Sequence, residues 1–295
     1  MRLLLLVWML LCAGFLASIT FDVDEIRVEA SADDSTAAWQ LAHHLAKDAV
    51  AVQRKLGVYP SYPLTLVVAS DNAQYQDLVK SAAPIIEFSE AAYQFSSRRM
   101  IVRNPRDVKQ YSRLRSIVLH EYIHSLVHYL WADAPLWFHE GMAVYFSGGL
   151  TSRRELNFMS NYAAGNYLPL QQMTKNYPES QLAWESLYAY SALAVKYLAT
   201  RHKKRWFAFF ARGASGESFY TSFRQSFYFT AQGFSHQFEA YAQSHFRMGM
   251  IFAVSALLWA CIPLILVIGA IRRKFIARRI LLRWQREEEK ESERI

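Results

Sequence analysis

HEYIHSLVHYLWADAPLWFHEG (residues 120–141) contains four of the nine histidines in this chain of 295 residues. His120 and His124 belong to an H-E-x-x-H motif, and positions four apart lie on one face of a helix. Two imidazoles placed in this way can bind one metal ion, with Glu121 beside the ion as a general base. The motif therefore predicts a metal-binding helix with His120 and His124 as ligands.

His128 continues the four-residue spacing but is not expected to bind the same ion. It lies eight residues from His120, which corresponds to a rise of ~12 Å along a helix. Metal–nitrogen bonds are ~2.1 Å long, so one ion cannot contact both side chains of an unbroken helix. His128 is therefore predicted to lie near the site without binding the metal.

The third ligand is expected from a second helix, which Asp133 and Pro135 would begin. Glu140 lies in the middle of this helix among apolar residues, where an acid is costly unless it is paired or bound to a metal. The short loop after Trp131 would fold the second helix back on the first. His139 is the rival ligand, but it lies one position round the helix, so only one of the two should face the site.

The C-terminal part of the chain contains an uncharged apolar stretch, residues 248–271. About 20 apolar residues span a bilayer, and positive residues flank the cytoplasmic end of such a span. Residues 272–295 contain nine Lys or Arg residues and five Glu residues. This pattern predicts a transmembrane helix over 248–271 and a cytoplasmic tail that contacts anionic lipid.

Residues 1–20 consist of Arg2 and an uncharged apolar run, which is typical of a secretory signal. No clear cleavage site follows, so both a cleaved signal and a retained anchor stay open. Either one predicts that residues 21–247 are exported and that the protein lies in the cell membrane with this domain periplasmic or extracellular. Cys12 and Cys261 lie in the two apolar segments, so the exported domain should have no disulfide.

The net charge of the whole chain is +8, and the exported part keeps about +3 once Arg2 and the tail, which is +4, are set aside. That charge is too small to suggest a nucleic-acid partner. Strand patterns occur at 24–31 and 63–70, with a hairpin or one bent strand at 91–104, and the chain then stays helical to about 246. The sequence predicts an α+β fold in which a small mixed sheet with helices precedes an all-helical half.

Fourteen aromatic residues lie between 205 and 246. Aromatic side chains bury large areas, so these residues are expected to form the core of the helical half. A substrate groove and a surface lying on the membrane are the alternatives.

The two motif segments resemble the gluzincin zinc metalloproteases, and most closely the peptidase MA-like group. That group follows its HExxH helix with a W-x-x-E-G-x-A-x-Y helix, and this chain matches the pattern at Trp137, Glu140, Gly141, Ala143 and Tyr145. The resemblance implies a thermolysin-like α+β fold with the zinc site between its halves. It also implies Zn²⁺ held by two histidines and a glutamate, and hydrolysis of peptide bonds.

A further segment, LYAYSALAVKYL (residues 187–198), is similar to the gluzincin helix that presents a catalytic tyrosine. The resemblance implies that Tyr190 stabilises the oxyanion of the tetrahedral intermediate, with Tyr188 as the less favoured alternative and a purely structural role for both left open. The family analogy also suggests that RRMIVRN (residues 98–104) pairs with an extended substrate.

No G-x-M-E-N-type motif, which binds a free amino terminus in aminopeptidases of this clan, occurs before His120. The sequence therefore favours an endopeptidase that acts on protein or peptide substrates. Two alternatives stay open: a membrane-tethered binding or scaffold protein without catalytic activity, and a zinc hydrolase of another substrate.

Overall fold

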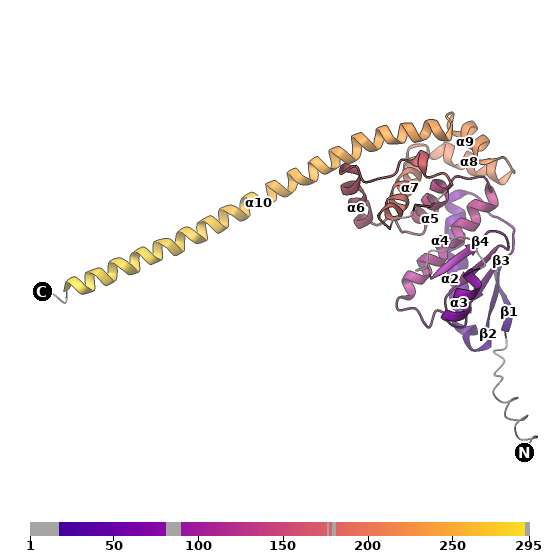
Figure 1. The fold of residues 1–295 in the computed structure, drawn as a ribbon, viewed down its shortest axis with the longest axis horizontal. Helices are drawn as coiled ribbons and strands as arrows, with labels where there is room; N and C mark the ends of the chain where they lie inside the picture. Colours follow the sequence, from indigo (N-terminus) through magenta and orange to yellow (C-terminus); the bar gives the residue numbers. More distant parts are fainter. Residues whose placement is uncertain (1–17, 81–89, 176, 179–180, 293–295) are drawn as a thin grey trace, which may run out of the picture. The chain divides into compact units, whose positions relative to one another are not determined.

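The computed structural model describes residues 18–80, 90–175, 177–178 and 181–292. The chain divides into two compact units, Met1–Ala240 and Tyr241–Ile295. The first unit holds a β-sheet with its covering helices and, after them in the chain, a group of helices (Figure 1).

The sheet is mixed and has five strands in the order β1-β2-β3-β5-β4. The three inner strands are parallel, and each outer strand pairs antiparallel with its neighbour. Leu66 of β3 lies between Val28 and Met100 in this register, and all three side chains are fully buried. The strands are β1 (Ser18–Val23), β2 (Ile26–Ser31), β3 (Leu64–Val68), β4 (Ala91–Gln94) and β5 (Arg99–Val102).

Helices cover both faces of the sheet, because neighbouring residues of a strand point to opposite sides. Val67 and Ile101 pack against Tyr75 and Val79 of α3 (Asn72–Lys80). The other face is covered by α2 (Ser35–Leu56) and α4 (Tyr111–Leu130), which contact the strands and each other. A short 3-10 helix, η1 (Ala32–Asp34), precedes α2.

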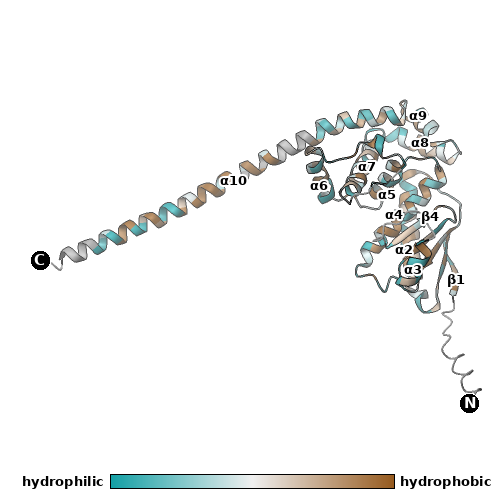
Figure 2. Cartoon of the chain, in the orientation of Figure 1, coloured by the Kyte–Doolittle hydropathy of each residue, from teal (hydrophilic) through white to brown (hydrophobic). Residues whose placement is uncertain are grey.

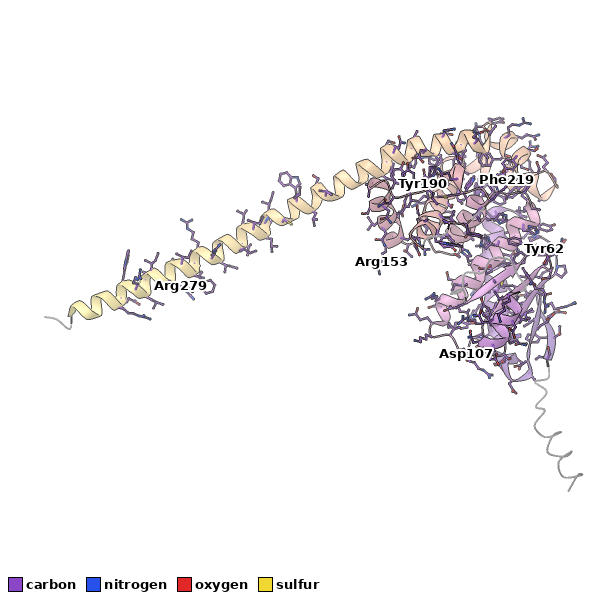
Figure 3. The ribbon with its side chains drawn as sticks, viewed as in Figure 1. Tyr62, Asp107, Arg153, Tyr190, Phe219 and Arg279 are labelled. Carbon is purple, nitrogen blue, oxygen red and sulfur yellow. The ribbon has the colours of Figure 1, made fainter. Side chains whose placement is uncertain are left out.

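The helical part begins with α4 and packs around a buried aromatic core. Trp131 lies at the centre of this core, with its ring centroid 4.2 Å from that of Phe209, and Phe219 lies among the packed side chains (Figure 3). The remaining elements are α5 (Leu136–Phe146), α6 (Ser152–Ala163), η2 (Leu170–Gln172), α7 (Gln181–Arg201), α8 (Lys203–Ala214), α9 (Phe219–Phe227) and α10 (Ala231–Ser292). Most of the aromatic residues between 205 and 238 are buried, which agrees with a core rather than with a groove or a membrane surface.

The predicted signal or anchor over residues 1–20 falls almost wholly outside the described residues. Its last three residues, from Ser18 to Thr20, belong to β1. This strand extends the sheet by one member beyond the strands predicted from the sequence, because its alternating pattern overlaps the end of the apolar run.

The predicted transmembrane helix over 248–271 needs correction. Within the described part of the chain, no helix is both long enough and apolar enough to cross a bilayer. The apolar stretch is part of α10, a helix of 62 residues that also carries polar and charged residues (Figure 2). The membrane location with one C-terminal span and the cytoplasmic C-terminus were derived from this helix, and they are corrected with it. The placement of residues 21–247 outside the cytoplasm was also predicted from residues 1–20, and the described residues do not support it.

Candidate metal centre

Polar contacts fix α4, the helix with the H-E-x-x-H motif, against α2. Arg115 of α4 donates two hydrogen bonds of 2.6 Å to the carboxylate of Asp48. Gln53 of α2 donates a hydrogen bond of 2.7 Å to the hydroxyl of Tyr122. A bidentate arginine–carboxylate pair restricts geometry as well as balancing charge, so these contacts set the rotation of α4 and the direction of its histidines.

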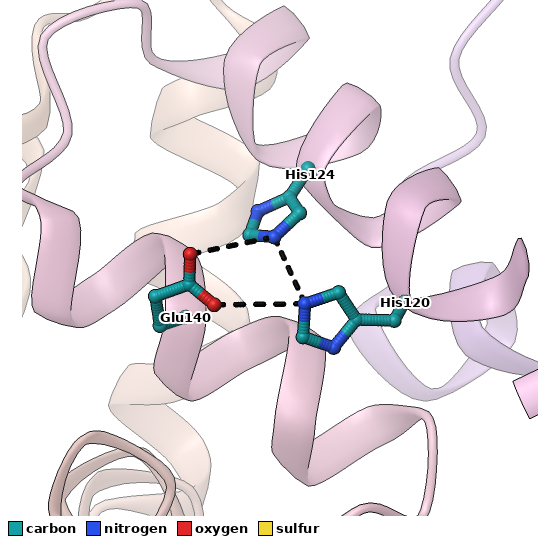
Figure 4. A group of neighbouring side chains, drawn as sticks. All are labelled: His120, His124 and Glu140. Atoms are coloured by element: carbon teal, nitrogen blue, oxygen red, sulfur yellow. Dashed lines mark hydrogen bonds and ion pairs between the residues drawn. The ribbon is translucent and has the colours of Figure 1, made fainter. Parts of the chain in front are cut away.

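His120 and His124 lie on the same face of α4, and their Nε2 atoms are 3.1 Å apart. Their side chains are 19% and 9% exposed. Figure 4 shows both rings directed toward one carboxylate, that of Glu140. The spacing of the motif therefore produces the convergence that a shared metal ligand set requires.

Glu140 reaches this point from α5. Its Oε2 atom is 3.5 Å from Nε2 of His120, its Oε1 atom is 3.7 Å from Nε2 of His124, and its side chain is 2% exposed. One ligand atom from each of the three residues lies within 4.8 Å of the other two. The structure thus brings together the three side chains that the sequence predicts as metal ligands.

Distant segments of the chain hold α5 in place. Its first two amides, on Leu136 and Trp137, donate to the carbonyls of Thr174 and Met173 at 3.0 and 2.9 Å. These bonds satisfy backbone donors that a helix start leaves open. Asp133, which was predicted to begin this helix, instead accepts a hydrogen bond of 3.0 Å from the amide of Phe219 at the start of α9.

Burial and mutual contact set the charges of the three candidate ligands. Burial alone would raise the pKa of Glu140, but the imidazoles of His124 and His120 and the hydroxyl of Tyr177 outweigh it and bring this pKa to about 2. Burial, together with the neighbouring His120, lowers the pKa of His124 to about 4. Burial alone would lower the pKa of His120, but the carboxylates of Glu140 and Glu121 outweigh it and raise this pKa. An ionised Glu140 beside a neutral His124 is the protonation state in which both bind a metal, and His120 would release its proton on binding one.

Glu121 lies beside the candidate ligands and contacts the sheet. Its Oε2 atom accepts a hydrogen bond of 2.9 Å from the backbone amide of Tyr93 in β4. Burial and the nearby Glu140 raise the pKa of Glu121 to about 7, against the lowering effects of His120 and of this amide. The carboxylate is therefore held in one orientation within a desolvated site.

His128 and His139 lie near the site but outside the group of three. The ring of His128 contacts Phe95, with centroids 4.9 Å apart. The ring of His139 lies 5.9 Å from that of His124 and 6.0 Å from that of Phe95. Burial lowers the pKa of His139 to about 3, so this histidine is a neutral neighbour of the candidate ligands.

The two tyrosines considered on α7 face different surroundings. Tyr190 is fully buried, and its hydroxyl donates a hydrogen bond of 2.5 Å to Glu239 rather than facing the candidate ligands. The ring of Tyr188 lies 6.2 Å from that of His120. The geometry therefore does not support an oxyanion role for Tyr190, and Tyr188 is the α7 tyrosine that borders the site.

The sheet edge next to α4 also differs from the sequence-based expectation. The segment RRMIVRN contributes β5, which is paired on both sides, by β3 and β4. The edge strand is β4, and it contacts α4. β5 is therefore an inner strand, and β4 is the outer strand on this side of the sheet.

Sequence reasoning missed one residue that contacts a candidate ligand. The hydroxyl of Tyr177 donates a hydrogen bond of 2.6 Å to Oε1 of Glu140. Its ring stacks on Trp184 at a centroid distance of 4.5 Å. Tyr177 lies in a loop with no motif of its own, so nothing in the local sequence indicates this contact.

The donor set fits a zinc ion. Two imidazoles and one carboxylate are the protein ligands of one class of catalytic zinc site. Oε2 of Glu140 is buried and has no hydrogen-bond partner among the described residues. This oxygen lies 3.5 Å from Nε2 of His120. A buried carboxylate oxygen without a hydrogen-bond partner is costly, so this position beside an imidazole suits a cation.

Known proteins show only a distant structural likeness to this chain. No protein-family model matches the chain, and no curated protein matches it. Among solved structures, the chain resembles a mutant M1 zinc metallopeptidase from Deinococcus radiodurans, with 15% sequence identity and a TM-score of 0.35. The match covers 68% of this chain and 45% of that one, so the chain spans less than half the length of that protein.

Proposed function

We propose that this chain is a zinc-dependent peptidase that hydrolyses peptide bonds within protein chains. The observation that carries the proposal is the convergence of His120, His124 and Glu140, with Glu121 held beside them. The absence from the sequence of a motif that would bind a free amino terminus favours an endopeptidase over an aminopeptidase.

His120, His124 and Glu140 would hold the zinc ion. When bound there, zinc supplies Lewis-acid polarisation of the scissile carbonyl and makes water a stronger nucleophile at neutral pH. Three protein ligands are the number found in catalytic zinc sites, which keep a further position open. The proposal needs no other cofactor.

Glu121 is the general base of this proposal. It would take a proton from the attacking water and pass it to the leaving amine. The amide of Tyr93 binds one carboxylate oxygen and so restricts rotation of the group. A carboxylate fixed by a backbone donor needs little reorganisation during the reaction, which is how preorganised groups lower barriers.

Tyr188 and β4 are proposed to contact the substrate. Arg154 lies over the ring of Tyr188, 5.9 Å from its centroid, and Trp184 flanks it at 5.7 Å, so its position beside His120 is supported from two sides. Its hydroxyl could donate to the oxyanion as the carbonyl becomes tetrahedral. An extended peptide could pair with the part of the edge strand β4 that does not bind Glu121, since the amide of Tyr93 is already used, and main-chain hydrogen bonds would then give affinity.

Two identical substitutions at different positions test this proposal. Glu121→Gln keeps the size of the side chain but removes its ability to accept a proton, so zinc content should stay at one ion per chain while turnover falls by roughly 10²–10⁴-fold. Glu140→Gln replaces a carboxylate ligand by a weak amide ligand, so zinc should be lost together with activity. Zinc would be measured by elemental analysis and turnover with casein and fluorogenic peptides.

Glu25→Gln at an exposed turn is the matched control, because it removes the same charge far from the candidate ligands; zinc and turnover should both equal those of the wild type. Full cleavage by Glu121→Gln would exclude Glu121 as the base. A zinc-loaded wild type that cleaves neither casein nor peptides would refute the peptidase and favour a binding protein or a zinc hydrolase of another substrate.

A further inference from the structure

Tyr177 occupies a defined position although it lies in a loop. Two carbonyls of the segment that leads to it, those of Met173 and Thr174, accept hydrogen bonds from the first amides of α5. The ring of Tyr177 stacks on Trp184 of α7 with an interplanar angle of 13°. Contacts with α5 and α7 therefore position the hydroxyl of Tyr177 beside Glu140.

The two oxygens of Glu140 have different surroundings. Oε1 accepts the hydrogen bond from Tyr177 at 2.6 Å. Oε2 is buried without a hydrogen-bond partner among the described residues and lies 3.5 Å from Nε2 of His120. Oε1 also lies 3.7 Å from Nε2 of His124, so both oxygens border the candidate ligands, but only Oε1 already accepts a hydrogen bond from the protein.

We infer that Tyr177 is a positioning residue, which engages Oε1 of Glu140 and thereby leaves Oε2 as the oxygen that binds the metal. The inference rests on the proposed zinc site. A glutamate side chain has several rotatable bonds, and a hydrogen bond to the oxygen that does not bind metal restricts them before the ion arrives. Partners that orient a ligand in this way typically contribute 10–100-fold to metal affinity.

A role for the hydroxyl in metal affinity differs measurably from a role in the reaction. A group that orients a ligand changes how tightly zinc is held and matters little once zinc is saturating. A group that contacts the substrate changes turnover of the loaded protein and leaves zinc affinity alone. Zinc affinity is therefore the property that separates the two roles.

The test is Tyr177→Phe, which deletes the hydroxyl and keeps a ring to stack on Trp184. Zinc affinity of the full chain would be measured by competition with a chromophoric chelator, and folding by circular dichroism and thermal melting without zinc. We expect the zinc Kd to rise roughly 10–100-fold.

Tyr167→Phe is the matched control. The hydroxyl of Tyr167 donates a hydrogen bond of the same length, 2.6 Å, to a carboxylate outside the candidate ligands, that of Glu239. Its substitution removes one tyrosine–carboxylate bond and should leave the zinc Kd unchanged, so it measures what such a loss does to folding alone.

An unchanged zinc Kd in Tyr177→Phe would overturn the inference, whether turnover falls or not. A rise of equal size in Tyr167→Phe would also overturn it, since the effect would then come from general loosening of the fold. A wild type that binds no zinc at all would refute the proposed metal site itself, and this outcome is separate from the other two.

Discussion

Gly141, the residue after Glu140, is where a single side chain would disturb the site most directly. A Cβ atom at this position would overlap the carbonyl of Ser191 on α7 and lie 2.7 Å from Cγ2 of Val195. The carbonyl of Ser191 belongs to the backbone of α7, so it cannot move without the helix. The absence of a side chain at Gly141 thus allows α5 to approach α7 and sets the depth of Glu140.

Gly141→Ala should lower the free energy of unfolding by about 1–3 kcal/mol, the usual cost of overpacking a core, and should weaken zinc binding because Glu140 moves with α5. Urea unfolding and zinc content are the measurements. Gly233→Ala is the control, since a Cβ there approaches only the side chain of Thr230, at 3.3 Å. Equal stability of the two variants would contradict this account of α5 packing.

Residue by residue, the sequence predicts the candidate ligands better than it predicts their partners. His120, His124 and Glu140 follow from helical spacing and from the cost of burying an acid. Tyr177 lies 37 residues from Glu140, in a segment without a recognisable pattern. Such a contact depends on how the chain returns to the site, which local sequence does not encode.

At the scale of elements, α7 carries two tyrosines, two residues apart in the sequence, that lie in different surroundings. Tyr188 borders the candidate ligands through His120. Tyr190 donates to Glu239, which also accepts hydrogen bonds from Tyr162 at 2.7 Å and Tyr167 at 2.6 Å. One side of the helix therefore contributes to the site, and the other ties α6, α7 and the start of α10 together.

Identical substitutions should separate these two sides. Tyr190→Phe removes a hydrogen bond to a carboxylate, so it should lower the free energy of unfolding by about 1.5–3 kcal/mol and leave turnover of the folded protein unchanged. Tyr188→Phe should leave stability nearly unchanged and reduce turnover by roughly 10²–10³-fold, as loss of an oxyanion donor does. Steady-state kinetics and chemical denaturation of both variants check this. The reverse pattern would restore Tyr190 as the catalytic tyrosine.

Helix boundaries show which elements can be read from sequence. α2 runs from Ser35 to Leu56 and ends at Gly57, whose φ of 71° suits glycine, so its C-terminal limit is set by the local sequence. The start of α5 is not local, because carbonyls of Met173 and Thr174 bind its first amides. Asp133 has the residue type of a helix cap, yet its carboxylate accepts a hydrogen bond at the start of α9 and not of α5. Only the folded chain reveals which helix it caps.

At the scale of the whole molecule, the candidate ligands lie on two consecutive helices that pack on different neighbours. His120 and His124 come from α4, which contacts the sheet, and Glu140 comes from α5, which contacts α4 and packs on α7. An ion held between them would bind the native state and not the unfolded chain, so it would stabilise the fold in proportion to its occupancy.

Zinc should therefore raise the melting temperature, and a chelator should lower it. At a thousandfold excess of zinc over its Kd the stabilisation amounts to about 4 kcal/mol. His120→Ala should melt at one temperature with or without zinc, because it lacks a ligand. Scanning calorimetry of both proteins checks this, and a wild type whose melting ignores both zinc and chelator would speak against a metal between α4 and α5.

The hydrogen bond from the amide of Tyr93 to Glu121 has a consequence for mutational surveys. The donor belongs to the backbone, so replacing the tyrosine by almost any other residue leaves the donor in place. Only proline lacks this N–H group. In a saturation library scored by activity, every substitution of Tyr93 except proline would therefore keep this hydrogen bond. Any loss of activity from the other substitutions would report on the ring. The survey would thus miss the dependence of the proposed base on the main chain of residue 93.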